Sequence, residues 1–300
     1  MAEQTKATAT SDFSGFLKPE QAQPIFDEAM KTSVVQSLAR QIPLGINGVE
    51  IPVTTGKPEA HWVAEGKRKP STSTALGIKT MKPSKLAAVT VVSAEVVRAN
   101  PGNYVEIYKR QIGEAFAKAF DKAALYGGGP FDSHIAQSTK SVTLGTSANG
   151  MYGDIVSGLD LLLKDKKKLN GFVFDTSAET LFLNQVDANK RPIFELNNVT
   201  EAPVPVSVGT LIGRSARLAD NVEDLASKTV GFGGDWTKCA WGVTSGLNFR
   251  VSTEAAVTVN GELVSLFESN MVAILAEAEY GWICADPESF VAFKTAGVGA

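Results

Sequence analysis

The sequence has few of the residues from which most metal and redox sites are built. Its 300 residues include two cysteines, Cys239 and Cys284, and two histidines, His61 and His134. The cysteines form no CxxC pair and have no cluster of histidines nearby, which argues against a zinc site or a disulfide framework. We interpret them as two buried, inert thiols in a reducing compartment, and we expect no metal and no cofactor.

An excess of one charge and long apolar runs are also missing. Lys and Arg number 29 against 32 Asp and Glu, a net charge of -3, whereas a chain that neutralises phosphates shows a basic excess or a basic tail. Tight, sequence-specific DNA binding is therefore not expected. No apolar run reaches the roughly 18 residues of a membrane span, and the N-terminus lacks a secretory pattern. We expect no membrane partner and a chain that stays in the cytosol where it is made.

Sequence signatures of catalysis are absent as well. The chain contains no G-x-S-x-G, no G-x-G-x-x-G and no G-x-x-x-x-G-K-[ST]. The triple glycine at 127–129 follows a predicted helix instead of opening one, so it indicates a helix end and not a phosphate site. We therefore predict that the chain is not an enzyme.

The sequence does contain enough apolar material for a folded core, with 44% hydrophobic and 20% charged residues. Apolar residues at three- and four-residue spacing predict a helix of about 23 residues, from 103 to 126. A helix at 152–168 is predicted to turn Ile155, Leu159, Leu162 and Leu163 inward. Shorter helices are predicted at 18–40 and 177–185, and strands at 42–53 (two around Asn47-Gly48), 85–97, 171–175, 210–218, 229–233 and 239–243.

Two long strand-like runs near the end of the chain, 249–259 and 266–283, are separated by Asn260-Gly261, which is a hairpin signal. Helices and strands follow one another without a regular βαβ repeat. The predicted fold class is therefore α+β.

Residues 54–84 differ from the rest of the chain because they hold many glycines and prolines and few large apolar residues. Alternation predicts two strands there, His61–Glu65 and Ala75–Met81. A two-stranded excursion with a thin core is only marginally stable alone in water. We expect this segment, with its basic run at 67–69, to lie against something else, such as a neighbouring subunit.

Three segments in one order resemble the tailed-bacteriophage major capsid proteins with the Hong Kong 97 fold. Residues 61–97 resemble a W-x-x-E-G-x-x-K-P loop followed by a strand. The helix ending in FDKAALYGGGP is similar to that family's D-x-A-x-x-x-G-x-G. Residues 266–293 are similar to its F-x-x-N-x-x-x-x-R-x-E-x-R segment that leads to P-x-A-F. Each motif is loose alone, but their order and spacing are specific.

The resemblance implies an architecture with four parts. These are an N-arm at 1–35, an extended hairpin loop at 51–85, a peripheral domain with a long spine helix at 36–50, 86–135 and 247–280, and an axial domain at 136–246 and 281–300. It further implies that the chain self-assembles as hexamers and pentamers into an icosahedral shell that encloses phage double-stranded DNA. The expected location is the virion, after assembly in the cytoplasm of the host bacterium.

The resemblance also implies partners. The first is the chain itself, and a portal and, optionally, decoration proteins are further ones. Packaged DNA is expected to be held without tight sequence-specific binding. The chain begins almost directly at the expected N-arm, which leads us to expect either a separate scaffolding protein or a processed N-terminus.

Site residues follow from the same resemblance. Loop residues expected at subunit contacts are Trp62, Glu65, Lys67, Arg68 and Lys69. One member of the family joins subunits by an isopeptide bond between a loop lysine and an asparagine, assisted by a glutamate. The matching positions are Lys69, Asn270 and Glu277. A carboxylate in apolar surroundings could take the proton that lysine must lose before it attacks a carboxamide.

Each of these three residues also has a plainer interpretation. Asn270 fits a hydrogen-bonded strand end, Glu277 fits an ion pair with a neighbouring base, and Lys69 fits a solvated or interface charge. Leu275 and Glu279 stand where arginine is common in the family. Two alternative functions stay open: an encapsulin-like compartment shell of the same fold, and an unrecognised cytosolic α+β enzyme.

Overall fold

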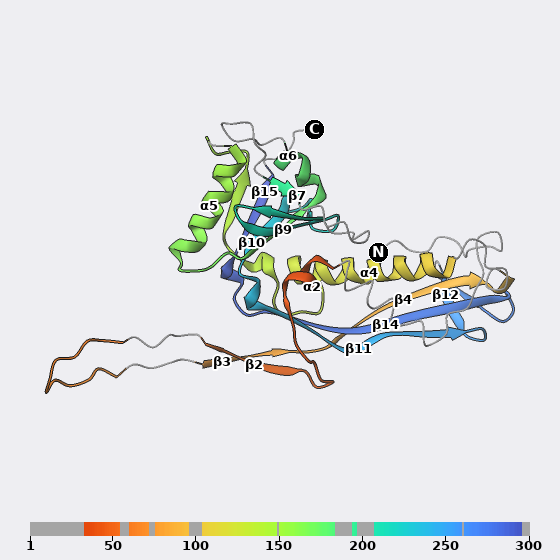
Figure 1. Cartoon of the computed structure of the whole chain (residues 1–300). Helices are drawn as coiled ribbons and strands as arrows, with labels where there is room; N and C mark the ends of the chain where they lie inside the picture. Colours follow the sequence, from red (N-terminus) through yellow and green to blue (C-terminus); the bar gives the residue numbers. More distant parts are fainter. Residues whose placement is uncertain are drawn as a thin grey trace.

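The computed structural model describes residues 33–54, 60–71, 76–95, 104–148, 150–183, 194–196, 207–259 and 261–295. Its strands form two larger sheets and two small hairpins (Figure 1). The long sheet has four strands, in the order β1 (Arg40–Gln41), β11 (Cys239–Ser252), β14 (Met271–Cys284) and β4 (Ser84–Ser93). The compact sheet has seven, in the order β5 (Ser141–Leu144), β15 (Phe290–Thr295), β10 (Thr229–Gly234), β6 (Gly171–Asp175), β9 (Arg214–Ala219), β8 (Ser207–Leu211) and β7 (Phe194–Leu196). The predicted α+β class is confirmed.

The long helix α4 (Tyr104–Tyr126) lies along one face of the four-stranded sheet (Figure 1). Its apolar spacing places Ile112, Phe116 and Phe120 on one side, and all three side chains are buried. They pack against every second residue of β14, namely Ala276, Ala278, Tyr280 and Trp282. The rings of Phe120 and Trp282 meet edge to face with centroids 6.0 Å apart.

The helix ends where the sequence predicts. Gly127 adopts a φ of 76°, which glycine reaches without steric cost, and its N–H donates to the Ala123 carbonyl at 3.1 Å. The helix predicted at 103–126 is therefore confirmed over 104–126, and position 103 lies outside the described residues.

The compact sheet is built around phenylalanines. All five residues of β6 are buried, and Phe172, Phe174 and Phe293 form one ring cluster. Glycines of β10 leave room for these rings, because a Cβ atom on Gly231 would lie 2.2 Å from the Phe174 ring. The strands predicted at 171–175 and 229–233 are confirmed.

Helix α5 (Gly150–Lys164) packs against this ring cluster, with Ile155 and Leu162 buried. Gly158 admits the Phe293 ring, since a Cβ atom there would lie 2.9 Å from it. The prediction that Leu163 points inward is wrong, because its side chain is 56% exposed. The helix contacts the compact sheet through positions 155, 158 and 162, which share one face of the helix. Position 163 lies on another face and points toward solvent.

The remaining short helices connect the sheets. They are α2 (Val34–Leu38), η3 (Ile135–Gln137), η4 (Thr176–Ala178), α6 (Glu179–Leu183), η5 (Trp236–Lys238) and η6 (Pro287–Ser289). The helix predicted at 18–40 and the N-arm predicted at 1–35 lie largely outside the described residues. Among the described helices, none is long and apolar enough to cross a membrane.

The extended loop begins and ends in a two-stranded ribbon, β2 (Val49–Thr54) with β3 (Leu76–Met81), which leaves the body of the molecule (Figure 1). Two sequence predictions are corrected here. Residues 42–46 form no strand, although Gly48 does make the predicted turn and donates its N–H to the Gly45 carbonyl at 2.9 Å. Residues 61–65 form no strand either, because β3 pairs with β2 and leaves them without a partner strand.

The second small hairpin joins β12 (Ala256–Val259) to β13 (Glu262–Ser265), as the Asn260-Gly261 signal predicts. Its apolar residues Val257 and Val259 pack with Leu266, Val91 and Ala273 on the four-stranded sheet. The run predicted at 249–259 is not a single strand, because it is divided between the end of β11 and β12, whereas the run predicted at 266–283 corresponds to β14 from Met271 onward. β11 begins at Cys239 and β14 ends at Cys284. At this shared end of the two strands, the chain connects to the compact sheet.

The base of the loop sits on two glycines that face each other across β11 and β14. Gly281 pairs with Gly242, and a Cβ atom on Gly281 would lie 2.6 Å from Leu44 Cδ2 and 3.0 Å from Met81 Cγ. We expect Gly281→Val to lower the free energy of unfolding by about 1–3 kcal/mol, because an overpacked side chain displaces Leu44 and Met81. Urea unfolding of the purified chain measures this.

Gly246→Ala is the matched control, since Gly246 also lies in β11 but has open space around its Cβ position. It should change the unfolding free energy by no more than about 0.5 kcal/mol. Equal effects of the two substitutions would show that the glycine pair does not seat the loop.

Candidate functional site

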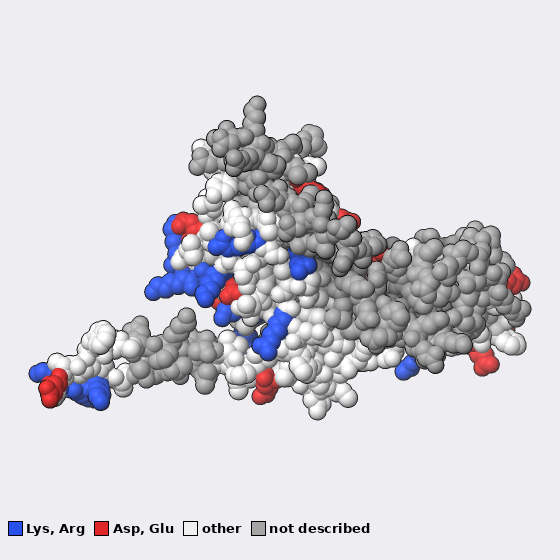
Figure 2. All heavy atoms as spheres, in the orientation of Figure 1, with Lys and Arg blue, Asp and Glu red and all other residues white. Residues whose placement is uncertain are grey.

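The tip of the extended loop carries the predicted contact residues, and all of them are exposed. Trp62 has a relative exposure of 103%, and Glu65, Lys67, Arg68 and Lys69 are exposed beside it. Figure 2 shows this mixed-charge tip at the far end of the loop. A turn shapes it, in which Lys67 donates its N–H to the Ala64 carbonyl at 3.1 Å and Gly66 has a φ of 76°.

Leaving the large apolar ring of a tryptophan fully in water is unfavourable. At the end of a projecting loop, such a ring is typical of a surface that binds another molecule. Within the described part of the chain, the four charged residues of the tip form no ion pair. The tip therefore offers an indole ring and a cluster of three cations with one carboxylate to another molecule.

The base of the loop is fixed, in contrast to its tip. Leu44, Met81 and Ile283 form a small buried cluster, with Ile51 of β2 packed against it. Lys79 of β3 donates to the Cys284 carbonyl at 3.4 Å. This packing of the loop base against the sheet was not predicted from the sequence. Gly242 and Gly281, which lie inside strand-like runs, were a signal that another segment approaches the backbone closely.

The other candidate surface is the face of the four-stranded sheet that α4 does not cover. Among the described residues, covering elements occupy only its two ends: the β12–β13 hairpin at one and the loop base at the other. Between them lie Val89, which is 48% exposed, the exposed Arg250, and Leu275 with Glu277 and Glu279 on β14. We call these five residues the open face.

The open face has an acidic part. Glu277 forms an ion pair with Lys85 of the same chain, with 3.4 Å between Nζ and Oε1. This agrees with the interpretation of Glu277 as the partner of a neighbouring basic residue. Glu279 lies directly opposite Lys85 in the strand register. This end of the open face therefore holds two carboxylates and one cation, Lys85, whereas Arg250 lies opposite Leu275 at its other end.

A buried carboxylate anchors residues 33–35, the last residues of the predicted N-arm. Asp121 of α4 accepts hydrogen bonds from Ser33 Oγ at 2.5 Å and from the N–H groups of Val34 and Val35 at 3.0 and 3.2 Å. Asn221 Nδ2 donates a fourth at 2.7 Å. Burial raises the pKa of Asp121 to about 6, although its four donors act in the opposite direction.

This geometry can be compared with known proteins. The phage capsid family matches residues 14–295 of the chain. The chain belongs to the phage capsid family. A probable major capsid protein of Mycobacterium phage D29 is 39% identical over 297 residues, covering 96% of this chain and 93% of that protein. A major capsid protein of Staphylococcus phage 80alpha is 27% identical and covers 92% of this chain and 84% of its own length.

Solved structures agree at the level of the fold. A chain from Gordonia phage Cozz has a TM-score of 0.69 at 22% identity and covers 89% of this chain and 87% of its own length. A chain from the capsid of an empty GTA particle has a TM-score of 0.62 at 16% identity, with coverages of 97% and 95%. The predicted resemblance and the Hong Kong 97-like fold are confirmed. The chain is a structural capsid protein and a component of the virion.

The cross-link candidates of this capsid protein do not meet within one chain. Lys69 is at the loop tip, whereas Asn270 precedes β14 at the end of the sheet that pairs with Ser93, away from the loop (Figure 1). Asn270 is exposed and has a φ of 50°. Glu277 lies seven residues further along β14, about 23 Å away at the usual rise of a strand. Any bond between Lys69 and Asn270 therefore requires more than one subunit.

The raised pKa of Asp121 predicts a pH dependence of stability. Because the folded-state pKa of about 6 lies above the ordinary value of 3.8, its stabilising effect is complete below about pH 4 and is lost as the pH rises through 6. We expect the unfolding free energy to fall by up to about 3 kcal/mol from this group over that range. Asp121→Asn should remove this part of the pH dependence.

Urea unfolding of both proteins at about pH 4, 5, 6 and 7 tests this, since the other titrating groups are common to both and cancel in the difference. A constant difference between the two proteins across the range would show that Asp121 keeps the same protonation in the folded and unfolded chains.

Proposed function

We propose that this capsid protein is the major shell subunit, which assembles as hexamers and pentamers into an icosahedral shell around phage double-stranded DNA. Relatives at 38–39% identity that are named as probable major capsid proteins support this, as does coverage of nearly the whole chain. The observation that carries the proposal is the loop tip. It presents an exposed tryptophan and a cationic cluster that nothing in the described part of its own chain covers.

The partner of the tip is the open face of a neighbouring subunit. Lys67, Arg68 and Lys69 of one loop complement the acidic excess that Glu277 and Glu279 create on the next sheet. Val89 and Leu275 offer apolar area for the Trp62 ring beside those charges. Each subunit then gives one loop and receives one, which is the head-to-tail contact that closes into rings.

The parts of the chain take the roles expected from the family. Residues 1–35 act as the N-arm, and residues 51–85 form the extended loop. Residues 36–50, 86–135 and 247–280 make the peripheral domain with α4 as its spine. Residues 136–246 and 281–300 make the axial domain, which packs around the five-fold and six-fold centres. The described structure adds that β11 and β14 carry the peripheral sheet on to Cys239 and Cys284.

Further partners belong to the same proposal. They are a separate scaffolding protein, a portal and, optionally, decoration proteins, with DNA held inside without sequence-specific contacts. The net charge of -3 supports weak contact with DNA, because a chain that binds phosphates tightly carries a basic excess. Packaged DNA inside purified particles distinguishes this function from an encapsulin-like compartment, which would hold enzymes.

A covalent form of the loop contact involves Lys69, Asn270 and Glu277. Exposure of Lys69 and Asn270 at opposite ends of the chain is compatible with a bond between subunits. Denaturing electrophoresis of assembled particles decides the question. A ladder that disappears in Lys69→Arg establishes the bond, whereas a single band near 31.8 kDa excludes it.

The loop contact predicts a charge-reversal phenotype. Reversing Lys67, Arg68 and Lys69 to glutamate should raise the concentration needed for shell assembly by roughly tenfold or more, because attraction between the cationic tip and the carboxylates Glu277 and Glu279 becomes repulsion. Negative-stain microscopy and sizing chromatography across a concentration series measure the threshold. Circular dichroism should show an unchanged fold, since these side chains are exposed.

Two further variants make the test specific. Lys67→Arg with Lys69→Arg keeps the charges and should assemble like the natural chain. Glu279→Lys added to the reversed loop should recover part of the assembly, while Glu279→Lys alone should weaken it. Equal assembly of the reversed and natural loops would remove the proposed contact.

A further inference from the structure

The two cysteines, which are 45 positions apart in the sequence, lie directly opposite each other in the structure. Cys239 is the first residue of β11 and Cys284 is the last residue of β14, and the strand register pairs them. Both side chains are buried and both thiols are free.

The hydrogen bonds around this pair define its type. Ala285 donates its N–H to the Lys238 carbonyl at 2.8 Å, so the next pair along the ladder is the hydrogen-bonded one. Cys284 donates its own N–H to Ser133 Oγ at 2.9 Å. The cysteines therefore occupy a non-hydrogen-bonded pair, in which Cα atoms lie about 4.5 Å apart. A disulfide needs about 4.4–6.8 Å between Cα atoms, so the backbone already meets this requirement.

We propose that Cys239 and Cys284 form a reversible intrachain disulfide at the junction between the two sheets. Before Cys239 the chain comes from β10 of the seven-stranded sheet through η5, and after Cys284 it enters β15 of the same sheet through η6. The β10–η5–β11 and β14–η6–β15 connections are thus the two places where the chain passes between the seven-stranded sheet and the β11–β14 pair. We call them the two crossings. A bond here joins both crossings to each other and restricts their relative motion.

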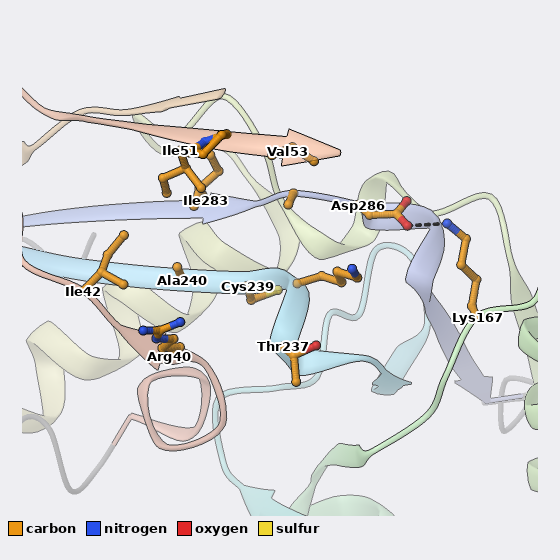
Figure 3. A pocket seen from close by; sticks show the side chains of 13 residues that line it. Arg40, Ile42, Ile51, Val53, Lys167, Thr237, Cys239, Ala240, Ile283 and Asp286 are labelled. Atoms are coloured by element: carbon orange, nitrogen blue, oxygen red, sulfur yellow. Dashed lines mark hydrogen bonds and ion pairs between the residues drawn. The ribbon is translucent and has the colours of Figure 1, made fainter. Parts of the chain in front are cut away.

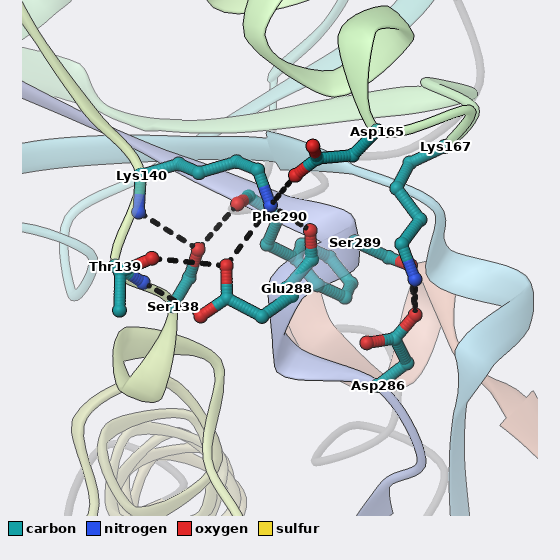
Figure 4. A network of polar contacts seen from close by, with 9 residues as sticks. All are labelled: Ser138, Thr139, Lys140, Asp165, Lys167, Asp286, Glu288, Ser289 and Phe290. Atoms are coloured by element: carbon teal, nitrogen blue, oxygen red, sulfur yellow. Dashed lines mark hydrogen bonds and ion pairs between the residues drawn. The ribbon is translucent and has the colours of Figure 1, made fainter. Parts of the chain in front are cut away.

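Ion pairs already hold the surroundings of this junction (Figure 4). Lys140 contacts Asp165 at 2.8 Å and Glu288 at 2.9 Å, and Lys167 forms an ion pair with Asp286. Burial lowers the pKa of Lys140, but these two carboxylates outweigh burial and raise it. The segment that follows Cys284 is thus held in place, which favours bond formation without a large rearrangement on that side of the pair.

A groove of about 590 Å³ lies beside the pair, and its lining includes Cys239 (Figure 3). Both cysteine side chains belong to the buried core cluster, with exposures of 1% and 0%, so an oxidant from this groove reaches them when the junction opens locally. Arg40 and Lys238 also line it, together with Lys167, whose charge is balanced by Asp286. This positive surplus favours an anionic low-molecular-weight disulfide, and glutathione disulfide is the oxidant that we name.

The exchange proceeds in two balanced steps. The Cys239 thiolate attacks one sulfur of glutathione disulfide, which forms a mixed disulfide and releases one glutathione thiolate. Cys284 then loses its proton and attacks the Cys239 sulfur, which expels the second glutathione. The protein gives up two electrons and two protons, and one glutathione disulfide becomes two glutathione molecules.

Burial raises the pKa of the Cys239 thiol, with further contributions from Cys284 and Asp235 in the same direction. The thiolate fraction is therefore small at neutral pH, and oxidation is slow. Slow oxidation suits a bond that stays open in a reducing cell and closes after release of the particle. This timing rests on the proposed function, whereas the bond itself does not.

The test counts free thiols on the unassembled full-length chain, so its outcome does not depend on shell formation. The folded chain is incubated with glutathione disulfide, denatured in acid, and labelled with a maleimide polymer that shifts a gel band once for each free thiol. We expect the count to fall from two to zero, without dimers on a non-reducing gel, and to return to two with dithiothreitol. Two remaining thiols, a stable mixed disulfide or an intermolecular dimer would overturn the proposal.

Cys239→Ala and Cys284→Ala are the matched controls, and each should keep its single thiol or form only a mixed disulfide. Thermal unfolding gives a second measurement that needs no variant. The oxidised natural chain should unfold at a higher temperature than the reduced chain, because the bond restricts the unfolded state. A lower temperature for the oxidised chain would show that the folded backbone does not accommodate the bond.

Discussion

The antiparallel pairing of β11 with β14 is the constraint on which the rest of the molecule depends. Fourteen residues on each strand make a ladder that spans the four-stranded sheet, and every other part attaches to it. α4 covers one face through Phe116 and Phe120, the β12–β13 hairpin covers one end of the other face, and the loop base covers the other end. Both strands also lead into the compact sheet, so their geometry sets where the two halves of the subunit lie.

The extended loop shows how a segment without a core of its own gains a defined direction. A two-stranded ribbon is only marginally stable alone. Here Leu44 and Met81 sit on the paired glycines Gly242 and Gly281, where the sheet has no side chains to hold them away. The order of the ribbon therefore comes from its base, while the tip is exposed and is covered by no other described part of its own chain. Such a division is suited to a segment whose remaining contacts are made with another subunit.

Sequence patterns were sufficient where the contacts are local. The spacing in α4, the all-apolar GFVFD of β6 and the Asn260-Gly261 turn each determine an element within a few residues, and these predictions are confirmed. They failed where partners lie far apart, as in the pairing of β2 with β3 in place of strands at 42–46 and 61–65. Asp121 looked like one polar position of an amphipathic helix, because its donors lie more than eighty residues away. The open face was equally unpredictable from the sequence. It is the part of the sheet that lies between the loop base and the β12–β13 hairpin, two elements that are far apart in the sequence.

The charges of the open face explain why a single contact between a loop tip and a neighbouring sheet is weak, whereas a closed shell of such contacts is stable. Glu277 and Glu279 lie on this sheet, and in the proposed contact the loop of a neighbouring subunit carries Lys67, Arg68 and Lys69 toward them. Exposed ion pairs contribute only about 0–1 kcal/mol each. In a closed assembly each subunit gives and receives a loop, so breaking one subunit free requires the loss of several contacts together. Weak, reversible contacts of this kind allow misplaced subunits to leave during assembly, and stability then comes from closure and not from any one interface.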